Sequence, residues 1–301
     1  MNSEVVINID GVYVDLLQQA LEGVHRASRG LEYLEIRPAP VVVQIDPRYS
    51  TITARKLNEA FALIERMSYL SGQGFYPSII TAYNKNYENY VEPNFIDPGS
   101  YGYRISRQLL RAFKLLKDDR YTRQAVINVY NYLEDNRGDV KNVPCTIALN
   151  FYIEQDDTLC LIAYMRSNDL IWGFPYDVSA FCFLQQVMAR WLGRPVGTYK
   201  HVATSLHLYV NKIEEAREVI KNYYSTFNHP LTADKEWDVP FDLTAAEVRK
   251  FWQVEEMIRV NHVPVSADDI IATFAGCEYL QSSLATLALY WKKRREKNER
   301  P

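Results

Sequence analysis

The sequence is poor in cysteine, lacks a long apolar run and carries little net charge. Its 4 cysteines have neither the CxxC spacing of a metal site nor the density of a disulfide framework. We therefore expect neither disulfides nor a bound metal. No apolar segment approaches the ~20 residues that span a bilayer, and the start MNSEVVINID lacks a basic stretch followed by an apolar one. These absences predict a cytoplasmic protein without a membrane partner.

The composition predicts one large unit. A formal net charge of -3 gives the chain no general attraction to nucleic acid, so we expect no nucleic-acid partner. The basic run KKRREK at 292–297 is typical of the solvated end of a helix. With 301 residues, of which 48% are apolar, the chain can bury a large core, and no linker rich in proline, glycine or serine divides it. We expect one domain over residues 1–301.

Apolar periodicity predicts both helices and strands. Spacing near 3.6 residues predicts helices at 12–24, 54–70, 104–117, 178–192, 243–258 and 267–292. Strand patterns fall at 124–132, 146–154, 158–165 and 203–210. Strict alternation in the second strand places four apolar side chains on one face, namely Ile147, Leu149, Phe151 and Ile153. The third is apolar on both faces, as in a central strand, and a hairpin across 155–157 joins the two. The fold class is α+β: a mixed sheet with helices packed against it.

Four short motifs carry the residues that are able to do chemistry. They are Pro144-Cys145, RSND (166–169), GFPYD (173–177) and HLY (207–209). A cysteine thiolate can attack an electrophilic ring carbon such as C6 of a pyrimidine, after which C5 can capture a one-carbon unit. That attack needs a lowered thiol pKa, which a nearby guanidinium would provide. The residues alone also allow Cys145 to be a small buried hydrophobe and Asp177, before an apolar run, to be a helix N-cap.

In order and spacing, these motifs closely resemble the active-site half of the thymidylate synthase family. That family reads P-C-x-x-x-x-[QN]-F, R-S-x-D, G-x-P-[FY]-[ND] and H-x-Y. The last residue of GFPYD is Asp177, where thymidylate synthases carry Asn. In the family that exchange separates uracil users from cytosine users. The resemblance, which covers roughly 55–215, therefore implies a thymidylate synthase-like fold and a nucleotide 5-hydroxymethylase that acts on CMP or dCMP.

The resemblance implies nucleotide-binding roles for five motif residues. Cys145 becomes the nucleophile that adds to the base. Arg166 and Ser167 bind the phosphate, and Arg166 also lowers the pKa of the thiol. His207 and Tyr209, two apart in an expected strand and hence on one face, hold the sugar 3′-hydroxyl.

Three further motif residues receive base-reading and folate roles. Asp177 reads cytosine, because a carboxyl that shares a proton with N3 can accept from the 4-amino group. Asp169 contacts the pterin of the folate cosubstrate, 5,10-methylenetetrahydrofolate, and Gly173 belongs to the same folate-binding set. No metal is implied.

Weaker similarity extends upstream of the nucleophile. ERMSYLSG (65–72) places Glu65 at the carboxylate that organises water and proton transfer around the base. PGSYGYR (98–104) makes Tyr101 the group that helps to remove the C5 proton.

The resemblance also implies a homodimer with shared phosphate sites. RYTRQAV (120–126) is similar to the stretch through which one subunit reaches the phosphate bound by the other, and it supplies Arg123. The N-terminal phosphate loop of the family is not recognisable; Arg29 is the nearest candidate and Arg48 another. A buried isologous interface would use the face of a sheet.

The chain departs from the family at several positions. The His that usually follows the nucleophile is Thr146, the Gln of the same motif is Asn150, and the second Arg of the dimer stretch is Gln124. The chain ends ALYWKKRREKNERP, whereas the family ends in a short apolar tail that closes over the folate. Because a lid that excludes water favours hydride transfer, its absence favours attack of water on a methylene intermediate.

The implied reaction starts with addition of Cys145 to C6 of the cytidine monophosphate. C5 then takes the one-carbon unit, and loss of tetrahydrofolate leaves an exocyclic methylene. Water adds to it with the help of Glu65, and elimination of Cys145 releases the 5-hydroxymethyl nucleotide.

Three other functions stay open. A thymidylate synthase with an unusual base pocket would produce dihydrofolate, and a non-catalytic relative would only bind nucleotide. A Cys-His hydrolase would pair Cys145 with His207, although no third group or oxyanion motif supports it. Ribose and deoxyribose nucleotides fit the pattern equally, as do a nucleoside-antibiotic pathway and phage-type DNA modification.

Overall fold

The protein is described by a computed structural model over residues 9–71, 77–89, 101–138, 140, 142–226, 243, 245–260, 266–274 and 277–297. Residues 98–100 of PGSYGYR and 298–301 of the C-terminal tail lie outside the described residues. The α-helices are α1 (Ile9–Leu21), α2 (Glu59–Ser71), α3 (Pro77–Tyr83), α4 (Tyr101–Asp118), α5 (Tyr132–Asp135), α6 (Phe174–Leu192), α7 (Ile213–Thr226), α8 (Ala245–Arg259), α9 (Ala267–Thr273) and α10 (Glu278–Glu296). The strands are β1 (Val24–Ser28), β2 (Leu31–Glu35), β3 (Val41–Ile45), β4 (Val126–Asn128), β5 (Thr146–Ile153), β6 (Leu159–Met165), β7 (Asn168–Asp169), β8 (Val196–Ala203) and β9 (Leu206–Tyr209). The short 3-10 turns are η1 (Pro47–Tyr49), η2 (Lys85–Asn89) and η3 (Val210–Lys212).

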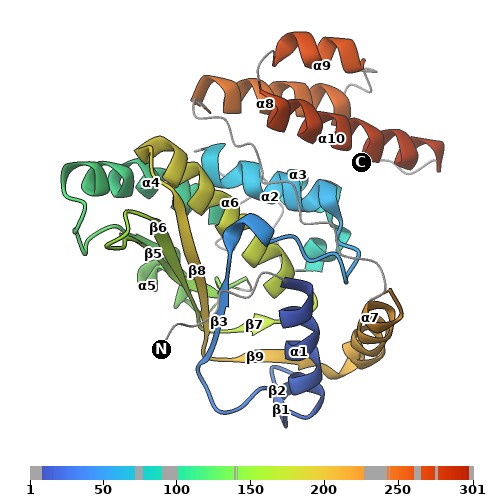
Figure 1. Cartoon of the computed structure of the whole chain (residues 1–301). Coiled ribbons are helices and arrows are strands. Elements are labelled where there is room, and N and C mark those ends of the chain that lie inside the picture. The colour runs from blue at the N-terminus through green and yellow to red at the C-terminus, as the bar shows by residue number, and fades with distance from the viewer. Residues whose placement is uncertain are drawn as a thin grey trace.

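The larger sheet of the described chain has five strands in the order β3-β8-β6-β5-β4. Strand β6 lies at its centre, as its apolar character on both faces predicts, and pairs antiparallel with β5 and parallel with β8. The parallel pair requires a crossover, which α6 supplies. Figure 1 shows α6, with α2 and α4, above one face of this sheet. The predicted α+β class is confirmed.

A smaller sheet brings distant motifs together. In the described residues it has four strands in the order β1-β2-β9-β7, and α1 and α7 lie beside it (Figure 1). The two-residue strand β7 runs parallel to β9, with Asn168 opposite Leu206 and Asp169 opposite His207. This pairing places RSND beside HLY, although about forty residues separate them in sequence.

Helix α6 is buried along nearly its whole length because it lies between the sheet and the other helices. It ends at Gly193, whose φ of 64° is the left-handed conformation that glycine adopts without strain. The C-terminal helices α8 and α10 pack on α2 around the buried Trp291 (Figure 1). The prediction of a single domain over residues 1–301 stays a prediction.

Several predicted elements differ from the structure for identifiable reasons. Helix α1 covers Ile9–Leu21 rather than 12–24, because the chain turns into β1 at Val24. Of the strand predicted at 124–132 only β4 forms, since the Asn131 side chain caps α5. The segment 203–210 is divided between the end of β8 and β9, and 267–292 between α9 and α10.

One prediction about a single side chain was wrong, and the prediction of a solvated basic run holds except at one residue. Ile147 does not share the buried face of β5 but is 41% exposed, because a bulge between Thr146 and Ala148 shifts the register. The basic run near the C-terminus is not wholly solvated, because Arg294 is buried, donates to the Ala82 carbonyl at 2.5 Å and lies over the Trp291 ring.

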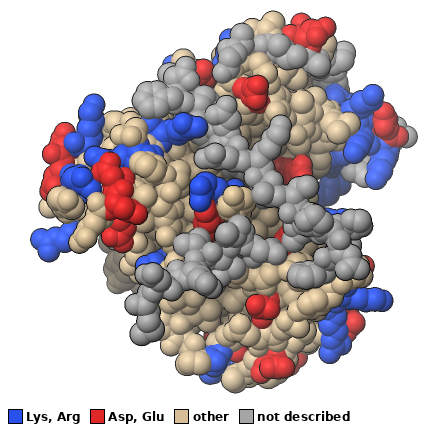
Figure 2. Space-filling view, viewed as in Figure 1, with Lys and Arg blue, Asp and Glu red and all other residues tan. Residues whose placement is uncertain are grey.

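Charge on the visible face is mixed. Figure 2 shows Lys and Arg side chains interspersed with Asp and Glu, which matches the small formal net charge of -3. In the described residues no helix is long and apolar enough to cross a membrane.

Candidate active site

A pocket of about 480 Å³ collects the motif residues from α2, α4, the start of β5, β7, α6 and β9. The predicted site residues that line it are Glu65, Tyr101, Cys145, Ser167, Asp169, Gly173, Asp177, His207 and Tyr209. The other lining residues are Phe61, Asn84, Asn86, Tyr87, Asn89, Asn142, Val143, Asn168, Trp172, Tyr176 and Lys212. Nine of the residues chosen from sequence therefore meet in one cavity.

Cys145 lies directly before β5, with Arg166 beside its sulfur. The Arg166 Nη2 donates to Sγ at 3.8 Å, and Nη2 and Nε donate to the carbonyls of Val143 and Pro144 at 2.8 and 2.9 Å. The guanidinium is thus anchored to the backbone that precedes the nucleophile. The expectation of a lowered thiol pKa was wrong as a net effect, because burial raises the pKa of Cys145 to about 11 and Arg166 only opposes it.

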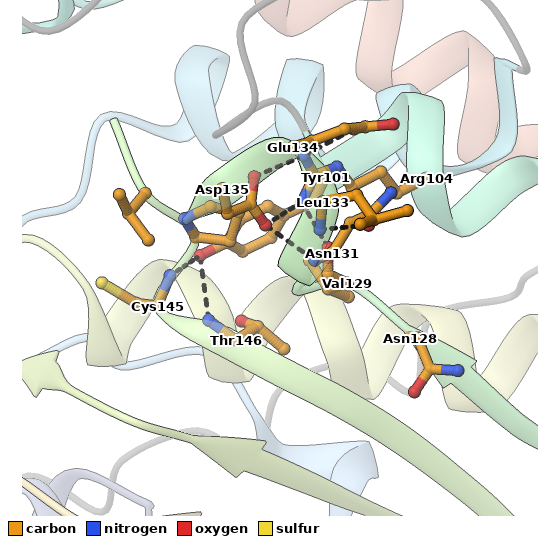
Figure 3. Close-up of polar contacts among 12 residues, drawn as sticks. Tyr101, Arg104, Asn128, Val129, Asn131, Leu133, Glu134, Asp135, Cys145 and Thr146 are labelled. Atoms are coloured by element: carbon orange, nitrogen blue, oxygen red, sulfur yellow. Dashed lines mark hydrogen bonds and ion pairs between the residues drawn. The ribbon is translucent and has the colours of Figure 1, made fainter. Parts of the chain in front are cut away.

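The backbone of the nucleophile is held by Tyr101 of α4. Its hydroxyl accepts from the amide nitrogens of Cys145 at 2.9 Å and Thr146 at 3.2 Å, while the Cys145 side chain projects away from these contacts (Figure 3). Burial, together with the charge of Cys145, raises the pKa of Tyr101, so that the hydroxyl keeps its proton. Tyr101 can therefore accept from the backbone and still donate.

One turn further along α4, Arg104 ties the helix to the segment before the nucleophile. It donates to both carboxylate oxygens of the buried Asp135 at 2.6 Å, to Glu134 at 3.0 Å and to the Val129 carbonyl at 2.6 Å (Figure 3). Asp135 in turn accepts from the backbone of Asn131 at 2.7 Å. Since Arg104 and Tyr101 are three apart on one helix, this bidentate pair fixes the position of Tyr101.

Two carboxyl groups in the pocket hold protons near neutral pH. Burial, followed by the charge of Asp177, raises the pKa of Glu65 to about 8. Its Oε2 is buried and has no hydrogen-bond partner within the described part of the chain. Burial also raises the pKa of Asp177 to about 7, although a hydrogen bond from Asn168 opposes the rise. Each group can give or take a proton at physiological pH.

The structure rules out the N-cap interpretation of Asp177. Helix α6 begins at Phe174 with Gly173 as N-cap, so Asp177 lies inside the first turn, and its Oδ2 accepts from Asn168 Nδ2 at 2.7 Å. The turn before the helix is held by Asp169 instead. Its carboxylate accepts from the backbone nitrogens of Ile171, Trp172 and Gly173.

His207 and Tyr209 line the pocket, and their rings pack against the ring of Tyr33. The ring centroids of His207 and Tyr33 lie 5.0 Å apart, and those of His207 and Tyr209 lie 4.9 Å apart. Burial lowers the pKa of His207, whereas Asp169 and Glu35 raise it. The expectation that the two residues share a face of one strand is confirmed.

The candidate phosphate-binding arginines lie in different places. Arg29 lies in the exposed turn between β1 and β2, and its charge only opposes the rise in the pKa of Cys145. Arg48 is engaged by the Asp46 carboxylate, with Nε to Oδ1 at 2.9 Å. Arg123 is exposed just before β4 and is not one of the described residues that line the pocket.

Two of the positions where the chain departs from the family lie on β5, which follows the nucleophile. Thr146 is fully buried and donates to Met165 Sδ at 3.3 Å. The Asn150 Oδ1 on β5 is buried and has no hydrogen-bond partner among the described residues. Gln124 is exposed.

Eleven of the residues that line the pocket received no role in the sequence analysis, and four of them illustrate why. Asn168 and Tyr176 lay inside the quoted motifs RSND and GFPYD but received no role. Trp172 and Lys212 lay just outside, and the Lys212 ammonium stands 4.9 Å from the centre of the Trp172 ring. Their nearness to motif residues was the only signal in the sequence. No group of three or more potential metal ligands occurs in the described residues.

Comparisons with known proteins agree on one protein family. The sequence matches the family model described as thymidylate synthase over residues 12–249. It is 32% identical over 249 residues to a deoxyuridylate hydroxymethyltransferase of Bacillus phage SP01, a match covering 75% of this chain and 64% of that protein. A deoxyuridylate hydroxymethyltransferase of Pseudomonas phage M6 is 27% identical over 219 residues, covering 69% of this chain and 62% of that protein. A thymidylate synthase of Listeria monocytogenes serovar 1/2a is 26% identical over 144 residues, which is 47% of this chain and 44% of that protein. The chain thus spans less than two thirds of the length of each of these relatives.

Proposed function

This chain belongs to the thymidylate synthase family, and we propose that it converts a cytidine monophosphate, CMP or dCMP, into its 5-hydroxymethyl derivative. The observation that carries the choice of base is Asp177. It lines the same pocket as Cys145, and its pKa of about 7 leaves a carboxyl proton available near neutral pH. A protonated carboxyl can donate to N3 of cytosine and accept from its 4-amino group.

Cys145 and its neighbours supply the nucleophile. We propose that Sγ adds to C6 of the base, with Arg166 stabilising the thiolate at 3.8 Å. Because Tyr101 holds the amides of Cys145 and Thr146, the sulfur is presented from a fixed backbone. The hydroxyl of Tyr101 is also the group proposed to assist removal of the C5 proton.

Glu65 is the residue of the pocket proposed to transfer protons. Its pKa of about 8 lies close to the working pH, where a carboxyl exchanges protons most effectively. The buried Oε2, which has no partner in the described chain, is suited to orient the water that becomes the new hydroxyl. Elimination of Cys145 then restores the free enzyme.

The pocket fits a folate as one-carbon donor. Trp172 lines it with 37% of its surface exposed, and Asp169 and Gly173, near Trp172 in the chain, line it as well. When bound, 5,10-methylenetetrahydrofolate supplies the one-carbon unit. Trp172, Asp169 and Gly173 are the residues proposed to hold it.

A homodimer is part of the proposal. On the face of the larger sheet away from α6, Val42, Val202 and Tyr164 follow one another across β3, β8 and β6. Val42 is 57% and Tyr164 38% exposed. A second copy on this face would bury these apolar side chains, and would let the exposed Arg123 serve the phosphate site of the partner.

The test is incubation with CMP, dCMP, UMP and dUMP plus methylene-folate, with products identified by mass. We expect 5-hydroxymethyl cytidine nucleotides. Asp177→Ala should lower kcat/KM for the cytosine nucleotide by about ten- to hundredfold, the cost of one or two unpaired groups on a base edge. Ser179→Ala, two residues further along α6 and also buried, serves as control and should keep its activity.

A second candidate is hydroxymethylation of dUMP. It is favoured by two relatives that bear the name deoxyuridylate hydroxymethyltransferase. A wild type that turns over dUMP better than dCMP would favour this candidate and contradict the cytosine assignment. Dihydrofolate as product would instead indicate a thymidylate synthase.

A further inference from the structure

A chain of buried hydrogen bonds runs from the large sheet to Asp177. On β8 the Tyr199 hydroxyl lies 2.8 Å from His201 Nδ1, and His201 Nε2 lies 3.0 Å from Asn168 Oδ1. Asn168 Nδ2 then donates to Asp177 Oδ2 at 2.7 Å. The four residues are between 0% and 7% exposed, so water does not compete for these contacts. Only Asp177 and Asn168 line the pocket.

The donor and the acceptor of each hydrogen bond in this chain can be assigned. Burial lowers the pKa of His201 to about 3, so the ring is neutral and carries a single proton. Because the Asn168 carbonyl oxygen can only accept, that proton is on Nε2, and Nδ1 accepts from the Tyr199 hydroxyl. The amide of Asn168 is thereby oriented with its N–H groups toward Asp177.

Packing prevents the amide from turning away. The backbone nitrogen of Asn168 donates to the Ser205 carbonyl at 2.7 Å in the pairing of β7 with β9. A Cβ at position 173 would lie 2.6 Å from Asn168 Nδ2, so only glycine leaves room for the amide there. Phe174, the next residue, packs edge-on against the His201 ring at 5.1 Å.

We propose that Asn168 is a specificity-determining residue, because it holds Oδ2 of Asp177 as an acceptor and so assigns the carboxyl proton to Oδ1. This inference rests on the proposed function and names the residue that makes its base choice selective. Asn168 acts through Asp177 as a positioning residue.

The position of the carboxyl proton of Asp177 decides which base it can pair with. Cytosine needs a donor opposite N3 and an acceptor opposite its 4-amino group, whereas uracil needs the reverse. A carboxyl whose proton can move between its oxygens satisfies either base. One with the proton fixed on Oδ1 satisfies only cytosine, when Oδ1 faces N3 and Oδ2 faces the amino group.

The first test is Asn168→Ala, assayed as the ratio of kcat/KM for dCMP to that for dUMP. We expect the ratio to move toward one by at least about tenfold, since mispairing one buried group costs that much. Gln186→Ala is the matched control. It removes another buried amide, which donates to the Pro47 carbonyl at 2.9 Å, and should leave the ratio unchanged. A ratio unaltered in folded Asn168→Ala overturns the inference.

A double-mutant cycle gives a sharper outcome. In Asp177→Asn alone, Asn168 should hold the new amide by its oxygen, so the shift toward dUMP that this exchange brings should be only partial. Adding Asn168→Ala frees that amide to rotate, and the double variant should accept dUMP at least about tenfold better relative to dCMP. Equal base ratios in Asp177→Asn and in the double variant contradict the inference.

A second route avoids changing either pocket residue. His201→Phe keeps a ring against Phe174 but removes the N–H that orients Asn168, so the base ratio should fall by several-fold while Asp177 and Asn168 remain. If Asn168→Ala does not fold, as judged by thermal unfolding, this variant decides the question. An unchanged ratio in His201→Phe then overturns the inference.

The pH profile separates positioning from a merely structural role. Loss of the Asn168 hydrogen bond raises the pKa of Asp177, so the fall of dCMP turnover with rising pH should move to higher pH in Asn168→Ala and not in Gln186→Ala. The other ionisable groups around Asp177 stay the same in both variants, namely Glu65, Asp169, Tyr69, Tyr101, Cys145 and Tyr199.

Failure of the proposed function can be told apart from failure of this inference. A wild type that prefers dUMP contradicts the cytosine assignment, yet Asn168→Ala must still move its ratio toward one. If no nucleotide is turned over, calorimetry can supply the dissociation constants for dCMP and dUMP. Their ratio then replaces the ratio of kcat/KM values. If this ratio is equal in wild type and in Asn168→Ala, the inference about Asn168 is overturned, whatever becomes of the proposed function.

Discussion

At the residue scale, the pocket is distinguished by buried acids that keep their protons. Glu65 lies on an amphipathic helix, where a carboxylate would ordinarily face solvent, yet its pKa is raised to about 8. A buried carboxyl held neutral is a common device for moving protons at neutral pH. It also makes folding stability depend on pH.

We expect stability to fall as pH rises. Glu65 binds its proton more tightly in the folded state, so its contribution is complete below the unfolded pKa of about 4.3 and is lost as pH rises through about 8. In urea unfolding between pH 4.5 and 8.5, Glu65→Gln should remove a decline on the order of 2–4 kcal/mol. The control Glu59→Gln, exposed on the same helix, should keep the decline. A wild-type profile that is flat over this range would contradict the raised pKa.

The nucleophile gives a second prediction at this scale. Cys145→Ser should abolish turnover while keeping nucleotide affinity within about tenfold, because a hydroxyl is nearly isosteric but far less ionised than a thiol. Turnover and calorimetric binding would both be measured. Cys160→Ser, a buried cysteine on β6 outside the pocket, should stay active. Measurable turnover by Cys145→Ser would exclude covalent addition.

At the element scale, the position of α4 relative to β5 depends on one buried ion pair. Arg104→Ala would leave the buried Asp135 carboxylate without its ion-pair partner. Breaking such a pair costs about 3–5 kcal/mol. Turnover should fall as well, because Tyr101 would lose the contact that fixes its helix.

Arg107→Ala, one turn further along the exposed side of α4, is the matched control and should change the unfolding free energy by less than about 0.5 kcal/mol. Chemical denaturation and kcat would be measured on both variants. If Arg104→Ala proved no less stable than Arg107→Ala, the pair would not be what fixes α4.

Periodicity was sufficient for the elements with a clear apolar face. It predicted α6, β5, β6 and the hairpin that joins the two strands. It missed β8, because the buried His201 reads as polar in the sequence. It missed β1 because all five residues of that strand are exposed, so no alternation marks it.

The site was predictable where a motif recorded it. The motifs indicated that Cys145, Asp177 and His207 belong to one site, and the three residues line one pocket. They gave no role to Asn168, because its orienting partner His201 lies 33 residues away on β8 and only the folded sheet brings the two together. The sequence also suggested a lowered thiol pKa from Arg166, and only the structure supplies the burial that outweighs it.

At the scale of the whole molecule, the dimer proposal can be tested by complementation. Arg123→Ala and Cys145→Ser subunits should each be inactive alone when Arg123 serves the partner's phosphate site. Mixed after verified subunit exchange, half the dimers are hybrids, and one site in each hybrid has both residues intact. Up to about a quarter of the sites should therefore recover.

Mixing Cys145→Ser with Cys145→Ser/Arg123→Ala subunits is the control and should recover nothing. Full exchange without recovery in the first mixture would count against shared sites.

Trp172 gives the molecule a property that has nothing to do with catalysis. The indole is partly exposed on the pocket wall, and two cations approach its ring, Lys212 at 4.9 Å and Arg55 at 5.5 Å. Indole emission responds to nearby charge and to stacked aromatic rings. The pocket thus contains an intrinsic fluorophore, through which its occupancy can be followed optically without any label.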